Sequence, residues 1–137
     1  MGSYSRELTV RLRDTDAAGI LYFSNQLVFA HETFEQCLDE QGWSVARQLT
    51  EEDFMVPIVH AESDYRAGLT LGDRLTVTMT IERIGTKSFT VAYVLRRGDE
   101  IVGNCRTVHA ALDRRTRTSI VLPEVVRDHL AEFCESS

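Results

Sequence analysis

Long apolar runs are missing from this sequence. No stretch approaches the ~18 apolar residues that a membrane-spanning helix needs, and the N-terminus carries polar and charged side chains within its first seven residues. This pattern predicts neither a secretory signal peptide nor a membrane partner. We therefore expect a soluble protein.

Basic charge is also scarce. The chain has 15 Lys and Arg residues against 21 Asp and Glu residues, for a net charge of −6. Proteins that bind nucleic acid normally present a basic face, so we expect no nucleic-acid partner. Local basic clusters remain compatible with a small phosphorylated ligand.

Cysteines are few and irregularly spaced. Cys37, Cys105 and Cys134 are three in number, and no two of them form a Cys-x-x-Cys pair. An odd number without ligand spacing disfavours both a disulfide framework and a structural zinc site. We therefore expect no metal and a reducing, cytoplasmic location.

The remaining composition is that of an ordinary globular protein. The 137 residues are 43% apolar and 26% charged. This length suits one domain over residues 1–137, large enough for a substantial core.

Two local patterns open the chain. Leu8, Val10 and Leu12 alternate with polar residues, which predicts a half-buried strand. Over residues 25–41 the apolar side chains recur at helical spacing, which predicts one long helix. Ser24 or Asn25 would cap its start, and Gly42 would end it.

The rest of the chain reads mainly as sheet. Strands are predicted over 56–65, 75–82, 89–95 and 101–112, and a last helix after Pro123. We expect the four strands to form an antiparallel meander. The fold class is then α+β, with about five strands and one long helix. The exposed edge and outer face of such a sheet predict a homo-oligomer.

Two acids and a glycine stand between the first strand and the long helix. Asp14, Asp16 and Gly19 in this position usually cap a helix or brace a turn. The helix N-terminus also offers unpaired backbone N–H groups, which suit a developing oxyanion. A carboxylate beside such a site can act as a nucleophile or a general base without a metal.

The segment 14–23, Asp-Thr-Asp-Ala-Ala-Gly-Ile-Leu-Tyr-Phe, resembles the signature of the 4-hydroxybenzoyl-CoA thioesterase family, which has the hotdog fold. Ala30-His31-Glu32 and Pro57-Ile58-Val59-His60-Ala61 resemble more narrowly the 1,4-dihydroxy-2-naphthoyl-CoA thioesterases of quinone biosynthesis. The likeness extends from about Tyr4 to about Leu112.

The resemblance implies a single hotdog thioesterase domain in which two subunits pair their sheets, giving a dimer or a tetramer. It matches Asp16 to the catalytic carboxylate and the backbone N–H of Phe23 to the oxyanion donor. Gly19 would let the loop pass close to the thioester, or serve as an ordinary turn glycine. We assign Asp14 a structural role, accepting hydrogen bonds from loop N–H groups.

Substrate contacts are also implied. His31, Glu32 and His60 lie in the segments that resemble the quinone-pathway enzymes and are candidates to line the acyl pocket. Side chains at the neighbouring positions 31 and 32 point about 100° apart on a helix, so both cannot face one ligand squarely. The alternatives are a solvated Glu32 and an interfacial His31.

Coenzyme A enters as part of the substrate, and no separate cofactor is expected. Its phosphates call for cationic side chains or backbone amides. The resemblance points to Thr86, Lys87 and Ser88. The cluster Arg114, Arg115 and Arg117 could serve the same purpose or form a solvated loop.

The resulting prediction is an acyl-CoA thioesterase acting on an aromatic acyl group, with 1,4-dihydroxy-2-naphthoyl-CoA as the favoured substrate. Alternatives are a thioesterase for short or medium aliphatic acyl-CoA, or for another aryl-CoA such as 4-hydroxybenzoyl-CoA. A non-catalytic acyl-CoA-binding protein and an inactive scaffold are weaker candidates.

Overall fold

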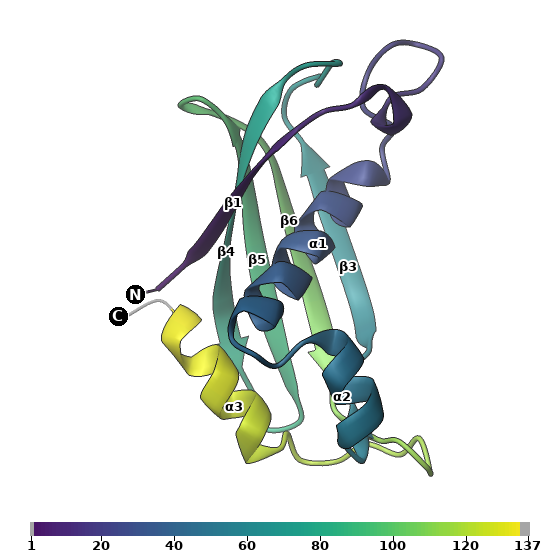
Figure 1. Cartoon of the computed structure of the whole chain (residues 1–137), viewed down its shortest axis with the longest axis vertical. Helices are drawn as coiled ribbons and strands as arrows, with labels where there is room; N and C mark the ends of the chain where they lie inside the picture. Colours follow the sequence, from purple (N-terminus) through teal and green to yellow (C-terminus); the bar gives the residue numbers. More distant parts are fainter. Residues whose placement is uncertain (1, 135–137) are drawn as a thin grey trace.

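One antiparallel sheet of five strands wraps around a single long helix (Figure 1). The structure is a computed structural model that describes residues 2–134. The spatial order of the strands is β1-β4-β5-β6-β3. Their bounds are β1 Tyr4–Thr9, β3 Ile58–Tyr65, β4 Arg74–Ile84, β5 Ser88–Arg97 and β6 Glu100–Ala110. The predicted α+β class and the sheet around one helix are confirmed.

The predicted four-strand meander is wrong. Strands β4, β5 and β6 are consecutive neighbours, but β3 pairs with β6 rather than with β4. The reason is that β1 already occupies the outer side of β4, from Tyr4 opposite Met79 to Thr9 opposite Arg74. The chain therefore crosses the sheet after β3, and β3 is left as an edge strand.

The long helix α1 (Asn25–Glu40) lies across one face of the sheet (Figure 1). It ends as predicted at Gly42, whose φ of +76° is a left-handed conformation that favours glycine. Ser24 occupies the N-cap position, but its side chain makes no capping hydrogen bond. The buried face of α1 consists of Gln26, Phe29, Ala30, Thr33, Phe34, Cys37 and Leu38.

Shorter elements close the ends of the sheet. Helix α2 (Val45–Glu51) is capped by Ser44, whose Oγ accepts the N–H of Arg47 at 3.1 Å. Strands β2 (Phe54–Met55) and β7 (Leu112–Asp113) form a second, two-stranded sheet. Helix α3 (Glu124–Leu130) begins after Pro123, as predicted, and two short 3-10 helices complete the fold, η1 (Leu12–Asp14) and η2 (Ala131–Phe133). Within residues 2–134, no helix is both long and apolar enough to cross a membrane.

Candidate active site

Residues 15–21 form a small hairpin between η1 and α1. Thr15 and Leu21 bridge its two arms, and the N–H of Asp16 donates to the Ile20 carbonyl at 2.9 Å. The turn closes where the Gly19 N–H donates to the Asp16 carbonyl at 2.9 Å. Gly19 has a φ of +81°, so the turn requires a residue that tolerates the left-handed conformation.

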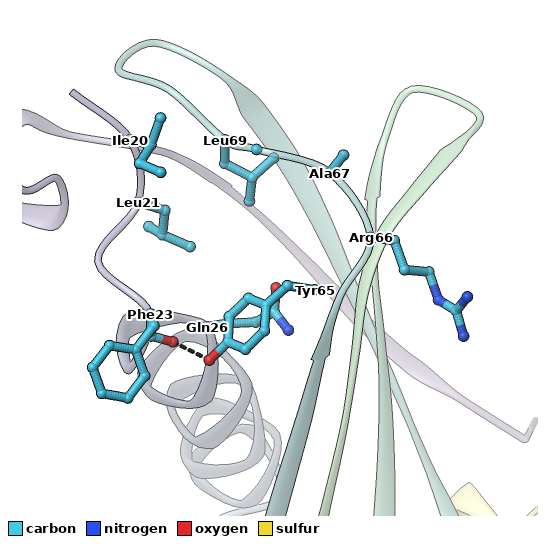
Figure 2. A pocket seen from close by; sticks show the side chains of 9 residues that line it. Ile20, Leu21, Phe23, Gln26, Tyr65, Arg66, Ala67 and Leu69 are labelled. Atoms are coloured by element: carbon cyan, nitrogen blue, oxygen red, sulfur yellow. Dashed lines mark hydrogen bonds between the residues drawn. The ribbon is translucent and has the colours of Figure 1, made fainter. Parts of the chain in front are cut away.

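The hairpin docks on the chain that follows β3. Ile20 bridges to Thr70, and the Leu21 N–H donates to the Leu69 carbonyl at 2.7 Å. Between the hairpin, the start of α1 and the end of β3 lies a pocket of about 420 Å³ (Figure 2). Its lining residues are Ile20, Leu21, Phe23, Gln26, Tyr65, Arg66, Ala67, Gly68 and Leu69. Asp16 lies on the hairpin arm opposite Ile20 and does not line this pocket.

Asp16 is exposed, and one of its two carboxylate oxygens is hydrogen-bonded. Its Oδ1 accepts the N–H of Ala18 at 2.8 Å, so the carboxylate braces its own turn. Across residues 2–134, no hydrogen bond or ion pair uses its Oδ2. The side chain is therefore held in place by one oxygen while the other stays available for chemistry.

Asp14 has the predicted structural role. Its Oδ2 accepts the N–H of Arg11 at 2.8 Å. Its carbonyl accepts the Tyr22 N–H at 2.9 Å and the Asn25 side-chain amide at 2.8 Å. This residue therefore holds both ends of the hairpin segment together.

Phe23 is separated from α1 by a single residue, the N-cap Ser24. The Tyr22 carbonyl accepts the Asn25 N–H at 2.9 Å, and the Tyr22–Phe23 peptide is trans. Since C=O and N–H point in opposite directions across a trans peptide, the Phe23 N–H points away from the helix. No hydrogen bond within the described chain uses it. A free N–H at the positive end of a helix suits an oxyanion.

His31 and Glu32 lie on the exposed side of α1. The Nδ1 of His31 is 3.2 Å from an oxygen of Glu35, while Glu32 forms an ion pair with Arg6 at 3.4 Å. Their side chains point in different directions and therefore have different partners. Both residues nevertheless border one shallow pocket of about 410 Å³. The other lining residues are Leu27, Val28, Glu35, Ile58, Ala61 and Thr107.

The structure does not bring His60 to these two residues. His60 is exposed on β3 and lies 3.1 Å from Glu62, which contacts Arg106 at 3.3 Å. Ala61, the neighbour of His60, faces the helix side, where it borders the His31 pocket. Because side chains alternate along a strand, His60 is on the outer face of the sheet.

A second pocket of about 270 Å³ also begins at His31, and we call it the apolar slot. It runs beneath α2, and His109 forms part of its wall. Its lining residues are His31, Phe34, Leu38, Val45, Gln48, Leu49, Phe54, Met55, Val56, Pro57, Ile58, His109 and Arg114. A mostly apolar cavity with a few polar groups is typical of a small-molecule site.

Thr86 and Lys87 are exposed in the turn before β5, and Ser88 begins that strand. The turn is fixed by its backbone, since the Thr86 carbonyl accepts the Leu122 N–H at 2.9 Å and the Gly85 N–H donates to Ser88 at 2.8 Å. The Lys87 ammonium forms no ion pair within the described residues. It is free to meet an anion.

The arginine cluster divides in two. Arg114 is half-buried and donates to the carbonyls of Gln48, Glu52 and Phe54 at 3.0–3.2 Å. It is therefore a structural residue, which neither interpretation from the sequence anticipated. Arg115 and Arg117 are exposed, which both interpretations allow.

The predicted site residues fall at opposite ends of one chain. The Asp16 hairpin docks where β3 ends, while Lys87 and the apolar slot lie where β3 begins. Pro57 and Lys87 flank the end of β6, because Ala110 donates to Pro57 and Ala111 donates to Lys87. A single chain does not bring Asp16 and Lys87 together.

Comparison with known proteins gives the family. The model of the thioesterase-like superfamily matches residues 10–130. The chain belongs to this superfamily. This thioesterase is 32% identical over 124 residues to a 1,4-dihydroxy-2-naphthoyl-CoA hydrolase of Nostoc punctiforme, an alignment covering 90% of this chain and 84% of the relative.

Two further comparisons agree. A relative of the same name from Synechococcus elongatus is 34% identical over 131 residues, covering 95% of this chain and 96% of its own. The crystal structure of a 1,4-dihydroxy-2-naphthoyl-CoA thioesterase from Synechocystis superposes with a TM-score of 0.89 at 29% identity, covering 96% and 97% of the two chains. The protein is therefore a hotdog-fold thioester hydrolase.

Three features of this region were missed from the sequence. They are the buried Gln26, the Tyr65 hydroxyl and the apolar slot under α2. Only Gln26 could have been found from the sequence, because it is a polar residue on the same buried helix face as Phe29 and Ala30.

In residues 2–134, no three His, Cys, Asp or Glu side chains are arranged as metal ligands.

Proposed function

We propose that this thioesterase hydrolyses 1,4-dihydroxy-2-naphthoyl-CoA to the free acid and coenzyme A, a step of phylloquinone or menaquinone biosynthesis. The substrate assignment rests on the name shared by two relatives, which are 32% and 34% identical to this chain over most of their length. The apolar slot bordered by His31 supports an aromatic acyl group with polar substituents.

In this proposal Asp16 is the catalytic carboxylate. Its free Oδ2 either attacks the thioester carbon, forming a mixed anhydride and releasing the thiolate, or takes a proton from the attacking water. Water completes both routes, and the products are the carboxylic acid and the thiol. The Phe23 N–H donates to the carbonyl oxygen as negative charge develops there, and Gly19 provides the tight turn that presents Asp16.

Lys87, with Thr86 and Ser88, is proposed to bind the phosphates of coenzyme A. An ammonium at an exposed turn is a suitable partner for a phosphate. His31 and Glu32 are proposed to meet the polar end of the acyl group, and His60 to approach it only across a subunit boundary. No cofactor is needed beyond the coenzyme A of the substrate.

A second copy of the chain completes the site in this proposal. Strand β3 is an edge strand, and Ile58 and Val59 are 40% and 60% exposed on it. Antiparallel pairing of two such edges places the end of one β3 beside the start of the other. The Asp16 hairpin of one chain then lies next to the apolar slot of its partner. Lys87 of that partner lies at the same end of the sheet as its slot.

An acyl-CoA panel tests the substrate. Free thiol release is measured with 1,4-dihydroxy-2-naphthoyl-CoA, 4-hydroxybenzoyl-CoA, benzoyl-CoA and several aliphatic esters. We expect kcat/KM for the naphthoyl ester to exceed the others by about 100-fold, since a shaped apolar pocket discriminates by a few kcal/mol. Faster aliphatic hydrolysis would overturn the substrate but not the family, and a chain that hydrolyses none of them would be an acyl-CoA-binding protein.

A further inference from the structure

The first turn of α1 is tied to the end of β3 by side chains that the mechanism above leaves unused. The hydroxyl of Tyr65 donates to the carbonyl of Phe23 (Figure 2). The amide of Gln26 donates to Ser63 Oγ at 2.8 Å and to the Asp64 carbonyl at 2.9 Å. Three consecutive residues of β3 therefore hold the segment 23–26 at the start of the helix.

The packing around Gln26 is built to keep this tie. Gln26 is only 1% exposed. A Cβ added to Gly103, which pairs with Tyr65 in the neighbouring strand, would lie 2.2 Å from the Gln26 Oε1. A side chain at position 103 would therefore displace the Gln26 amide from this place in the sheet.

These contacts fix the backbone on both sides of the proposed oxyanion donor. On one side, the Tyr22 N–H donates to Asp14, and the Tyr22 carbonyl accepts from Asn25. On the other side, the Phe23 carbonyl accepts from Tyr65. The Phe23 N–H lies between these anchored groups and is itself unbonded within the described chain. Its direction is therefore set by its neighbours.

We propose that Tyr65 is a positioning residue for the reaction, acting through Phe23. Its hydroxyl holds the carbonyl of Phe23 and so keeps the N–H of the same residue aimed at the developing oxyanion. A donor aimed in advance needs no reorganisation when charge appears, which is the source of its catalytic effect. The inference rests on the proposed role of Phe23. Figure 2 shows the Tyr65 ring against the start of the helix, while Arg66 points away from the pocket.

The variant Tyr65→Phe tests this role because it removes one oxygen and keeps the ring. We expect kcat to fall about tenfold, a fraction of the effect of deleting an oxyanion donor, with KM changed by less than about twofold because uniform binding is untouched. The pH profile of kcat should keep its shape, since Asp16 is intact. Thermal unfolding checks that the variant folds.

Tyr4→Phe is the matched control. The Tyr4 hydroxyl donates to Glu40 and so ties the opposite end of the same helix. Its loss should leave kcat unchanged. Amide hydrogen exchange gives a readout independent of turnover: the Asn25 N–H, which donates to the Tyr22 carbonyl at the same turn, should exchange faster in Tyr65→Phe than in Tyr4→Phe.

Distinct results overturn the two proposals. Wild-type turnover with an equal kcat in Tyr65→Phe overturns the positioning role and leaves the thioesterase mechanism standing. A wild type that hydrolyses no acyl-CoA overturns the proposed function, and with it the role of Tyr65 in it. An unchanged exchange rate at Asn25 overturns the positioning role even without turnover.

Discussion

His109 shows how burial sets the chemistry of a single residue. It is 1% exposed and stacks on Phe89 with ring centroids 4.6 Å apart. Its two ring nitrogens lie 3.0 Å from Thr107 Oγ1 and 3.2 Å from the Val56 carbonyl. Burial, with a smaller contribution from nearby His31, lowers the pKa of His109 from 6.5 to about 4. The ring beside the apolar slot is therefore neutral at pH 7.

This lowered pKa predicts a pH-dependent stability. Between the two pKa values the unfolded chain binds more protons than the folded one, so the free energy of unfolding falls as pH falls. From about pH 7 to about pH 5 the loss attributable to His109 should be about 2 kcal/mol. Urea unfolding at a series of pH values measures it.

Two variants isolate the contribution of this side chain. His109→Gln should flatten the stability curve over this range, and the exposed His60→Gln is the matched control. Equal slopes in wild type and His109→Gln would show that this histidine is not the titrating group.

At the residue scale, the candidate side chains that could be predicted from the sequence are those within one contiguous motif. Asp16, Gly19 and Phe23 are near neighbours in the chain, and the structure places them on one hairpin and the helix start that follows it. Tyr65 and His109 act through residues about 40 and 50 positions away, Phe23 and Val56. Such contacts exist only after the sheet has formed, so no local sequence pattern predicts them.

At the scale of elements, Arg114 joins the end of α2 to the second sheet. Its guanidinium donates to the carbonyls of Gln48 and Glu52, at the C-terminal end of the helix, and to Phe54 of β2. A cation at this end also complements the helix dipole. Helix α2 lines the apolar slot through Val45, Gln48 and Leu49. By holding the end of this helix, Arg114 supports one wall of that cavity.

Loss of this arginine should therefore destabilise the protein. Arg114→Gln is expected to lower the free energy of unfolding by about 2 kcal/mol, the usual size for hydrogen bonds from a charged group. Arg115→Gln, an exposed neighbour, should change it by less than about 0.5 kcal/mol. Denaturant unfolding measures both, and equal effects would contradict the structural role.

The elements themselves were largely predictable because their periodicity is local. The long helix, its end at Gly42 and the strands of the sheet all follow from patterns of a few residues. The neighbours of β3 were not predictable in this way. Its place beside β6 depends on which side of β4 is taken by β1, a choice made by residues more than 60 positions apart, such as Thr9 and Arg74.

At the scale of the whole molecule, the length of the sheet separates the proposed catalytic and phosphate-binding groups. Strand β4 has 11 residues, which span roughly 35 Å at ~3.3 Å per residue. Asp16 lies at one end of the sheet and Lys87 at the other. We therefore expect each working site to combine Asp16 of one chain with Lys87 of another.

Complementation between variants tests the shared site. Asp16→Asn should be inactive, and Lys87→Ala should lose about tenfold in kcat/KM through its phosphate contact. When the two are refolded together in equal amounts, one site in about four combines intact Asp16 and intact Lys87 across a symmetric interface. The mixture should then regain about a quarter of the wild-type kcat/KM.

The contrary result is equally clear. If both groups belonged to one chain, the mixture would show no more than the mean of its two components. Light scattering on the wild type provides the companion measurement, with a mass of two or more chains expected.

The most direct test of the central claim is the rate of thiol release from 1,4-dihydroxy-2-naphthoyl-CoA by wild type, Asp16→Asn and Asp14→Asn. We expect Asp16→Asn to lower kcat by about 1,000-fold, as loss of a catalytic carboxylate does. Asp14→Asn keeps an oxygen that can accept the Arg11 N–H and should stay near the wild-type rate. An Asp16→Asn variant as active as the wild type would contradict carboxylate catalysis at this hairpin.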